Sequence, residues 1–269
     1  MKVAILGSGI NALIAAWAAE RSGHEPELMA NTATHSVIPA DMFLLEKIPD
    51  INAPSFQLEV YLKGNKKGYA ERVYGDPSAP CALDTFLPGR YVVWGMRETY
   101  EQLWRMYGSE IKEHALEHSD LEAIARSYDL ALSTIPANVL CRGDHSFYGV
   151  DTYHLKIPGD DRGFFQSSMV YNGELEADTA GANWYRFSSI RGIDTWEYTH
   201  VVPGRTTTGI KPIETNCDCY ESIATSRSAR PGQLHRIGRF AKWTRGVLAH
   251  HAFQDTVAHM ANEGMLKSI

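Results

Sequence analysis

The first thirty residues alternate between apolar runs and small residues in the order strand, helix, strand. Residues 2–6 form an apolar run that ends at Gly7, which indicates a buried parallel strand. Residues 11–21 carry alanine and leucine at helical spacing, so we expect a helix that packs closely on a sheet and stops before Gly23. Residues 27–30 are predicted to form the second strand. This order predicts a βαβ unit.

The middle of the chain predicts further strands and helices in alternation. The alternating apolar pattern predicts strands over 55–63, with Gly64-Asn65 as a turn, and over 90–96. Helical spacing predicts helices over 97–107, ended by Gly108, and over 120–127. An edge strand is expected within 109–118, and a buried strand over 128–135 that ends at Pro136.

The second half of the chain has a different pattern of residue types. The segments QSSMVYNGE, NWYRFSSIRG and TWEYTHVV are rich in aromatic residues and separated by turns, which predicts an antiparallel sheet. A last strand is expected in LHRIGR, and a last amphipathic helix over Val247–Glu263.

These patterns predict an α/β fold in which two domains interdigitate. A Rossmann-type, dinucleotide-binding domain with a parallel sheet is expected from residues 1–50, about 105–140 and 233–269. A smaller antiparallel β (α+β) substrate domain is expected from about 51–104 and 141–232.

Composition places the chain among soluble globular proteins. Of its 269 residues, 44% are hydrophobic and 22% charged, and no apolar run reaches the roughly 18 residues of a membrane span. Met1 and Lys2 lead directly into the first strand, which argues against a signal peptide. We therefore expect a cytoplasmic protein with no membrane partner, and its oligomeric state stays open.

The glycine turn after the first strand predicts a dinucleotide site. Gly7 permits a tight turn, Gly9 lets a pyrophosphate approach the backbone, and Ala12 allows close packing of helix on sheet. The helix N-terminus then offers N–H groups and a partial positive charge to the phosphates. The residues expected at the pyrophosphate are Gly7, Ser8, Gly9, Ile10, Asn11 and Ala12.

The end of the second strand leaves the choice of cofactor open. An acidic residue that would accept hydrogen bonds from the ribose is replaced by Ala30 and Asn31. Asn31, Thr32 or Thr34 could provide neutral hydrogen bonds instead. The missing carboxylate would also tolerate the 2′-phosphate of NADP, although no arginine lies nearby in the sequence to hold it.

The net charge argues against a protein that binds nucleic acid through overall electrostatic attraction. The formal net charge is −6, which disfavours tight duplex binding. A local basic segment could bind an anionic ligand such as a pyrophosphate or nucleotide, or could simply be a solvated face. It contains Arg227, Arg230, Arg236, Arg239, Lys242 and Arg245.

The four cysteines do not suggest a disulfide framework in a chain of this length. Cys217 and Cys219 could be half of a metal site, but no second pair at ligand spacing is visible in the sequence. We therefore expect no metal and interpret the two residues as reduced thiols in a loop.

Several later segments, taken in order, add a resemblance to a flavoprotein group. YDLALSTIPANVL, WYRFSSIRGIDTWEY, IKPIE and HRIGRFAKWTRGVLAHHAF resemble the corresponding parts of flavoprotein amine oxidases and UDP-galactopyranose mutases. This resemblance implies FAD as the cofactor. Two departures weaken the link to the mutase reaction: the chain is much shorter, and THSVIPADMFLL replaces a glycine-rich segment.

The resemblance also implies site residues on the FAD. Gly238 and Arg239 match a Gly-Arg pair that returns along the cofactor, and Trp243 matches the aromatic residue that follows. Val247 and Leu248 match backbone N–H groups at the pyrimidine edge of the flavin, before the last helix. There a partial positive charge would stabilise the reduced anionic flavin.

A second set of residues is implied at the substrate. Tyr185 and Arg186 match a strand whose arginine meets the substrate, and Glu197 lies on a neighbouring strand. Arg191 could add a further contact to an anionic substrate. Arg186 and His251 are the expected catalytic residues, with His251 a candidate proton carrier beside the flavin.

Three functions remain compatible with these observations. The first is an FAD-dependent oxidoreductase, or a redox-neutral mutase-like flavoenzyme, for a small substrate that is anionic or carries a nucleotide. The second is an NAD(P)-dependent reductase. The third is a non-catalytic nucleotide-binding module, with a flavoenzyme that modifies a nucleic-acid base as a variant of the first.

Overall fold

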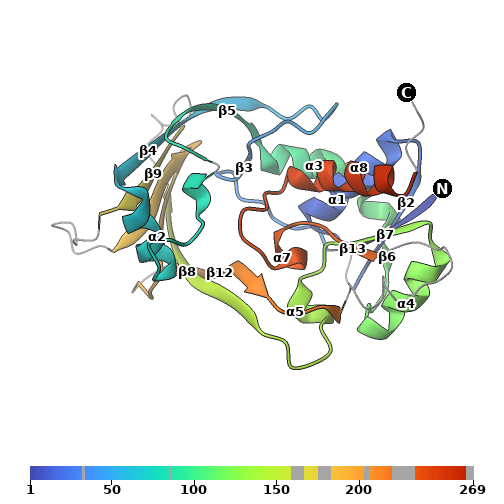
Figure 1. Ribbon diagram of the computed structural model, residues 1–269. Helices are drawn as coiled ribbons and strands as arrows, with labels where there is room; N and C mark the ends of the chain where they lie inside the picture. The colour runs from blue at the N-terminus through green and yellow to red at the C-terminus, as the bar shows by residue number, and fades with distance from the viewer. Residues whose placement is uncertain are drawn as a thin grey trace.

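The computed structural model describes residues 1–31, 34–84, 86–158, 167–174, 183–202, 206–219 and 234–264. Two β-sheets lie beside each other, one flanked by helices and the other forming a broad curved layer (Figure 1). The N-terminus lies on the side of the helix-flanked sheet (Figure 1).

The helix-flanked sheet has five parallel strands, and their order matches a nucleotide-binding architecture. The order is β13 (Leu234–Arg236), β7 (Leu130–Ser133), β1 (Lys2–Leu6), β2 (Glu25–Ala30) and β6 (Lys112–Glu113). Every neighbouring pair runs parallel. The predicted α/β fold with a parallel sheet is therefore confirmed, and its strands come from three separate parts of the chain.

Helices cover both faces of this sheet because β1 alternates its apolar side chains. Val3 and Ile5 belong to a core shared with α1 (Ile10–Arg21), α3 (Met96–Tyr107) and α8 (His251–Asn262). Ala4 and Leu6 face the opposite core, formed with α4 (His118–Ser127) and α5 (Ala137–Leu140). The alanine-rich face of α1 is fully buried, as the sequence predicts.

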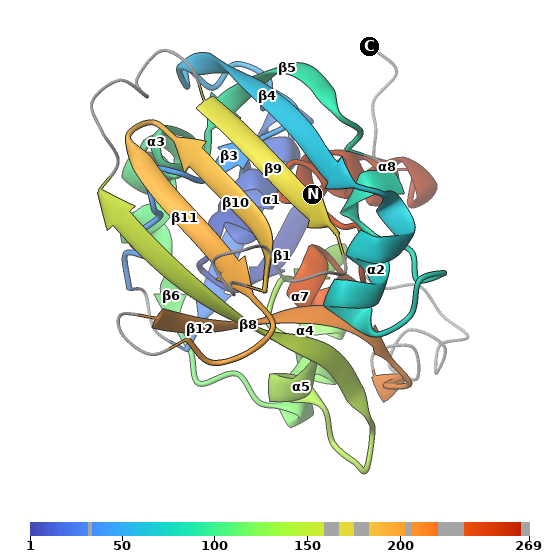
Figure 2. The same cartoon turned by 90° about the vertical axis from the view of Figure 1, so that its left-hand side faces the viewer.

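The second sheet has eight strands and is seen in Figure 2. Its order is β12 (Thr206–Thr215), β8 (Phe147–Pro158), β11 (Ile193–Tyr198), β10 (Trp184–Ile190), β9 (Ser167–Gly173), β4 (Ser55–Gly64), β5 (Gly89–Gly95) and β3 (Phe43–Leu44). All neighbours are antiparallel except β4 and β9. The expected antiparallel sheet is thus mixed at one position.

A helix that the sequence pattern did not predict packs on this second sheet. α2 (Lys66–Tyr74) follows β4 directly, and the Asn65 side chain accepts a hydrogen bond from the Gly68 N–H at 2.9 Å. Asn65 is therefore a helix N-cap rather than a residue of a hairpin turn. A Cβ on Gly68 would lie 2.0 Å from the Gly173 carbonyl oxygen, so this glycine permits close contact with β9.

The last helix begins four residues later than predicted. The sequence predicts a start at Val247, whereas α8 begins at His251. Gly246 has a φ of +76°, which interrupts helical geometry just before the expected start.

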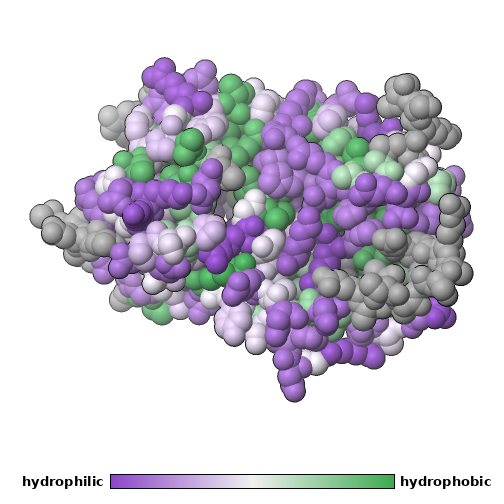
Figure 3. Space-filling model, in the orientation of Figure 1, coloured by the Kyte–Doolittle hydropathy of each residue, from purple (hydrophilic) through white to green (hydrophobic). Residues whose placement is uncertain are grey.

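Hydrophilic side chains cover most of the face seen in Figure 3, and the hydrophobic patches between them are small. None of the helices in the described part of the chain combines the length and the apolar character needed to span a bilayer.

Two stacked histidines beside the parallel sheet predict a loss of stability in acid. His235 and His259 have ring centroids 3.9 Å apart, and burial lowers the pKa of His235 to about 4. Because the unfolded chain takes up this proton near pH 6.5, stability is fully present above about pH 6.5 and falls as the pH drops toward about 4. We expect a loss of about 1–2 kcal/mol between about pH 7 and about pH 5 from this group.

Urea unfolding of the wild type and of His235→Phe at both pH values measures this contribution. The variant removes the titrating ring, so its free energy of unfolding should decline less over the same interval. Equal declines in the two proteins would contradict the assignment to His235.

Candidate functional site

The predicted glycine turn lies at the carboxyl end of β1, the edge where α/β sheets bind ligands. Gly7 has a φ of +123°, and a Cβ there would lie 2.3 Å from Thr134 Oγ1, so a side chain does not fit. Gly9 precedes α1 with a φ of −78°, and a Cβ there would meet no atom of the described residues within 4 Å. The turn therefore presents backbone and the helix N-terminus to open space.

The Gly-Arg pair near the other end of the chain lies against this turn. A Cβ on Gly238 would be only 2.2 Å from Asn11 Nδ2, so the residue-11 side chain packs directly on the glycine. Asn11 Oδ1 and Arg239 Nε are both buried and have no hydrogen-bond partner among the described residues. Such orphaned polar atoms are costly unless a ligand satisfies them. The structure thus brings the glycine turn and the Gly-Arg pair together, and both were expected to contact the same cofactor.

Two other residues expected at the pyrophosphate pack on the core side of the turn. Ala12 is fully buried, and Ile10 is partly buried and packs against the core beneath α1. Ser8 is partly buried beside Gly9.

Asn31 has a structural partner at the end of β2. Its Oδ1 accepts a hydrogen bond from the Leu116 N–H at 2.7 Å, which fastens the segment after β6 to β2. Asn31 remains exposed, and a ribose contact from it stays a prediction. Thr32 lies outside the described residues.

A second group of polar residues forms a row across the eight-stranded sheet. In register, Tyr171 on β9 lies beside Arg186 on β10, Arg186 beside Glu197 on β11, and Glu197 beside His154 on β8. The register shifts between Trp184 and Arg186, as in a β-bulge. The bulge lets neighbouring residues of β10 reach one carboxylate.

Glu197 is the centre of this group, and only 3% of it is exposed. Arg186 Nε donates to Glu197 Oε1 at 2.8 Å, and the Tyr185 hydroxyl donates to Oε2 at 2.5 Å. Lys211 Nζ lies 3.4 Å from Oε2 and 4.0 Å from the centroid of the Tyr185 ring. The structure therefore brings Tyr185, Arg186 and Glu197 together as expected, and adds Lys211 from β12.

The charges of this group shift its protonation equilibria. Burial opposes ionisation of Glu197, but the charges of Arg186 and Lys211 and the Tyr185 hydrogen bond together hold its pKa well below the ordinary value. Burial lowers the pKa of Lys211 to about 7, against the attraction of Glu197. Lys211 can therefore exchange a proton near neutral pH, which an ordinary lysine cannot.

Arg239 connects the glycine turn to the polar row. It begins α7 (Arg239–Lys242), and its charge adds to the burial and the charge of Arg186 that lower the pKa of Lys211. Three cationic side chains, Arg186, Lys211 and Arg239, thus influence one another around the single carboxylate of Glu197. This excess of positive charge favours an anionic ligand.

Arg191 does not join this group. It occupies the β10–β11 turn with a φ of +50°, and its Nη2 lies 2.5 Å from Glu98 Oε1 on α3. Five residues along a strand separate it from Arg186, a distance of roughly 15 Å. The strand direction thus places Arg186 and Arg191 at opposite ends of β10, and a contact of Arg191 with the same substrate stays a prediction.

Two of the residues expected at the flavin edge form a hydrogen bond with each other. The Leu248 N–H donates to His251 Nδ1 at 3.2 Å, so these two groups form a local turn before α8. Val247 is partly buried and precedes the helix. Trp243 is 3% exposed and donates from Nε1 to the Tyr148 carbonyl at 2.9 Å, so we assign it to packing on β8.

Three of the four described members of the basic segment have partners within the chain. Arg236 donates to the Cys217 carbonyl at 2.9 Å, Lys242 pairs with Asp255 at 2.6 Å, and Arg245 donates to the Pro80 carbonyl at 3.2 Å. Arg227 and Arg230 lie outside the described residues. Arg239 Nε is buried and has no hydrogen-bond partner among the described residues.

Sequence reasoning missed two features. Lys211 lies in the quoted segment IKPIE, but nothing in its local pattern indicates a buried lysine. Cys141 and His145 lie against Cys217 and Cys219, with all four ligand atoms within 4.8 Å of one another. The expectation that the two later thiols lack a second pair of ligands is therefore wrong, because the fold supplies that pair from 76 residues away.

Comparisons with known proteins bear on the fold. No protein-family model and no curated protein sequence match the chain. A tryptophan 6-halogenase from Streptomyces toxytricini aligns over 96% of this chain and 71% of its own, with a TM-score of 0.52 and 11% identity. The oxygenase MHPCO aligns over 98% and 81%, with a TM-score of 0.51 and 11% identity.

A third structure is described as an FAD-containing monooxygenase, from Photorhabdus luminescens. It aligns over 100% of this chain and 91% of its own, with a TM-score of 0.50 and 10% identity. These structures are oxygenases and a halogenase, and they do not specifically support the amine oxidase and mutase grouping. At this level of identity they establish a shared fold: the chain has the architecture of these enzymes.

Proposed function

We propose that this protein is an FAD-dependent enzyme that acts on a small anionic substrate. The observation that carries the proposal is the contact of Gly238 with Asn11, which joins the Gly-Arg pair to the glycine turn and leaves two buried polar atoms without partners. The fold shared with an FAD-containing monooxygenase supports the choice of cofactor by analogy.

The residues around the turn fit the pyrophosphate of such a cofactor. Gly9 offers the backbone without a Cβ, and the N-terminus of α1 offers N–H groups and a partial positive charge. Asn11 Oδ1 would accept a hydrogen bond from a ribose or adenine group, and Arg239 Nε would donate one to a phosphate. Bound FAD would supply two-electron redox chemistry.

The substrate is assigned to the space beside the polar row. Arg239 and Lys211 would bind its anionic group, because the carboxylate of Glu197, which accepts hydrogen bonds from Arg186, balances only one of the three cationic side chains. Glu197 holds Arg186 and the Tyr185 hydroxyl in place, so these groups do not reorganise when substrate arrives. Lys211, with a pKa of about 7, would hold or release a proton at Nζ.

Two finer assignments belong to the same proposal. Net oxidation of the substrate is favoured over a redox-neutral rearrangement, since the enzymes that share the fold include oxygenases. A nucleotide attached to the substrate would add further anionic groups for Arg239, so it is compatible with the site. We further propose a location in the cytoplasm.

The cofactor is tested by purifying the protein and substituting Gly9. The purified protein should be yellow and should release FAD on denaturation. Gly9→Val should reduce FAD occupancy at least about tenfold, since its side chain would fill the space assigned to the pyrophosphate. Its melting temperature without FAD should stay close to the wild-type value, because the new Cβ meets no atom of the described residues within 4 Å.

A matched substitution separates blockage of the site from general damage. Ala16→Val adds the same kind of side chain to the buried face of α1, away from the turn, so it should lower stability more than FAD affinity. A colourless wild type that takes up no FAD on titration, or a Gly9→Val protein with unchanged FAD occupancy, would contradict the proposal.

A further inference from the structure

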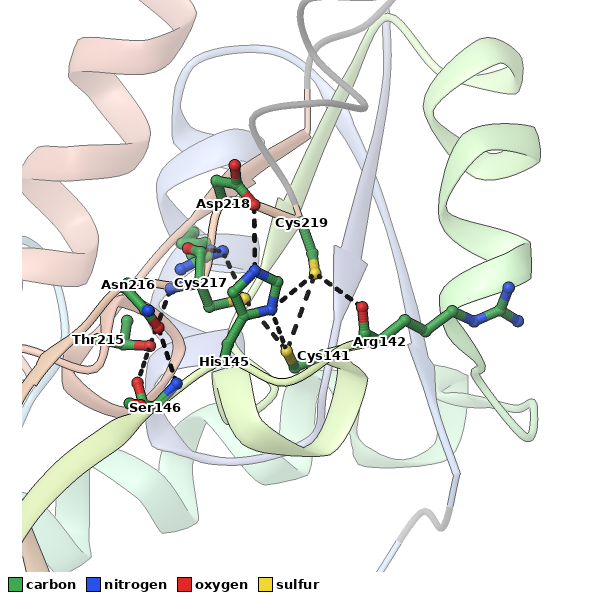
Figure 4. Close-up of polar contacts among 10 residues, drawn as sticks. Cys141, Arg142, His145, Ser146, Thr215, Asn216, Cys217, Asp218 and Cys219 are labelled. Atoms are coloured by element: carbon green, nitrogen blue, oxygen red, sulfur yellow. Dashed lines mark hydrogen bonds and ion pairs between the residues drawn. The ribbon is translucent and has the colours of Figure 1, made fainter.

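Three thiols and one imidazole converge outside the proposed flavin site (Figure 4). Cys141 directly follows α5 and His145 lies in the loop before β8, while Cys217 and Cys219 follow β12. Their four ligand atoms, three Sγ and one Nδ1, all lie within 4.8 Å of one another. All the cysteines are free, so the cluster is not held by a disulfide.

The distances agree with the edges of a metal-centred tetrahedron. Cys141 Sγ lies 3.5 Å from Cys217 Sγ and 3.8 Å from Cys219 Sγ. His145 Nδ1 lies 3.0 Å from Cys141 Sγ and 3.6 Å from Cys219 Sγ. With Zn–S bonds of about 2.3 Å and a Zn–N bond of about 2.0 Å, a tetrahedral site has S···S edges of about 3.8 Å and S···N edges of about 3.5 Å.

The surroundings complete the arrangement expected of a metal-binding histidine. His145 turns Nδ1 toward the sulfurs, and its Nε2 lies 3.4 Å from the carboxylate of Asp218 (Figure 4). A carboxylate in this position fixes the ring and its tautomer. Arg236 Nη2 lies 3.5 Å from Cys217 Sγ and offers a positive charge to a thiolate.

The cluster occupies a junction in the fold. It joins the start of β8 to the end of β12, where Thr215 Oγ1 donates to the Ser146 carbonyl at 2.8 Å and the Ser146 N–H donates to Asn216 Oδ1 at 2.7 Å. Cys217 and Cys219 also contribute to the core under α4 and α5 of the parallel sheet. A metal here would fasten the two strands that run between the sheets to the nucleotide-binding half (Figure 1).

We propose that Cys141, His145, Cys217 and Cys219 bind one zinc ion in a structural Cys₃His site. Four protein ligands fill a tetrahedral coordination sphere and leave no position for substrate, and three thiolates favour zinc over harder cations. The site is independent of the proposed flavin chemistry. It joins two segments of the chain that are far apart in sequence: His145 and Cys217 are separated by 72 positions.

The metal content of the purified protein tests this proposal. Untagged protein, prepared without chelators and analysed by inductively coupled plasma mass spectrometry, should contain about one zinc per chain and little iron. Protein loaded with cobalt instead should show the intense visible absorption of tetrahedral cobalt with thiolate ligands. Zinc below about a tenth per chain, or iron in its place, would overturn the proposal.

Variants assign the metal to these ligands. Cys217→Ser should lower zinc content at least about fivefold, whereas Cys81→Ser, at a buried cysteine of a different core, should leave it unchanged. Should Cys217→Ser fail to fold, wild-type protein treated with a strong zinc chelator provides the second measurement. Its melting temperature should fall and return on addition of zinc but not magnesium. Detection of a disulfide among these cysteines in freshly purified protein, or a zinc-bound Cys217→Ser, would refute the site.

Discussion

Replacement of Glu197 by alanine should lower the free energy of unfolding by about 3 kcal/mol. The carboxylate is buried and holds Arg186, Lys211 and the Tyr185 hydroxyl, so its loss leaves two cations and a hydroxyl without their shared partner. We place the effect at the lower end of the range of about 3–5 kcal/mol, because 29% of the Arg186 side chain remains exposed. Urea unfolding followed by circular dichroism measures the change.

The same substitution in an exposed pair provides the control. Glu122 pairs with Arg126 one turn along α4, and both side chains are largely exposed. Glu122→Ala should therefore cost less than about 0.5 kcal/mol. If Glu197→Ala and Glu122→Ala destabilise the protein equally, Glu197 does not organise the polar row as we describe.

A second substitution separates the charge of Glu197 from its shape. Glu197→Gln keeps the side-chain volume and an oxygen for the Tyr185 hydroxyl, but it removes the negative charge that the cations face. Arg186→Met in that background removes one of the cations left unpaired. It should restore part of the lost stability, as expected for two members of one network.

The strands and helices around the parallel sheet were predictable because their patterns are local. The apolar run 2–6 and the alanine-rich helix after it needed no tertiary information, and β1 and α1 lie at the predicted positions. α2 was missed because Gly68 weakens the helical pattern. Gly68 permits close contact with Gly173, and the sequence does not reveal this contact because the two glycines are more than a hundred positions apart.

The candidate site was predictable only in part, since its members meet through strand register. Arg186 and Glu197 lie in recognisable strands, but their pairing depends on the β10–β11 hairpin and its irregularity. The same hairpin sends Arg191 to the opposite end, which spacing in the sequence cannot reveal. Cys141 and His145 join Cys217 and Cys219 because β8 and β12 are neighbours, and neither strand was predicted.

Gly238 is the position where a single methyl group should have the most specific effect on the proposed cofactor site. Its φ of +82° and ψ of +166° belong to a region that is essentially restricted to glycine, so alanine there costs about 1–3 kcal/mol in backbone strain. The new Cβ would also lie 2.2 Å from Asn11 Nδ2, which forces the Asn11 side chain out of the turn. We expect Gly238→Ala to lose both stability and most of its FAD.

Gly246→Ala distinguishes backbone strain from the contact with Asn11. Gly246 also has a positive φ, +76°, but a Cβ there meets no atom of the described residues within 4 Å. This variant should be destabilised by about 1 kcal/mol and keep its FAD. The two variants are compared by urea unfolding without FAD and by titration with FAD. Equal loss of FAD in both would mean that strain, and not displacement of Asn11, explains the effect of Gly238→Ala. Undiminished FAD binding by Gly238→Ala would place the cofactor elsewhere.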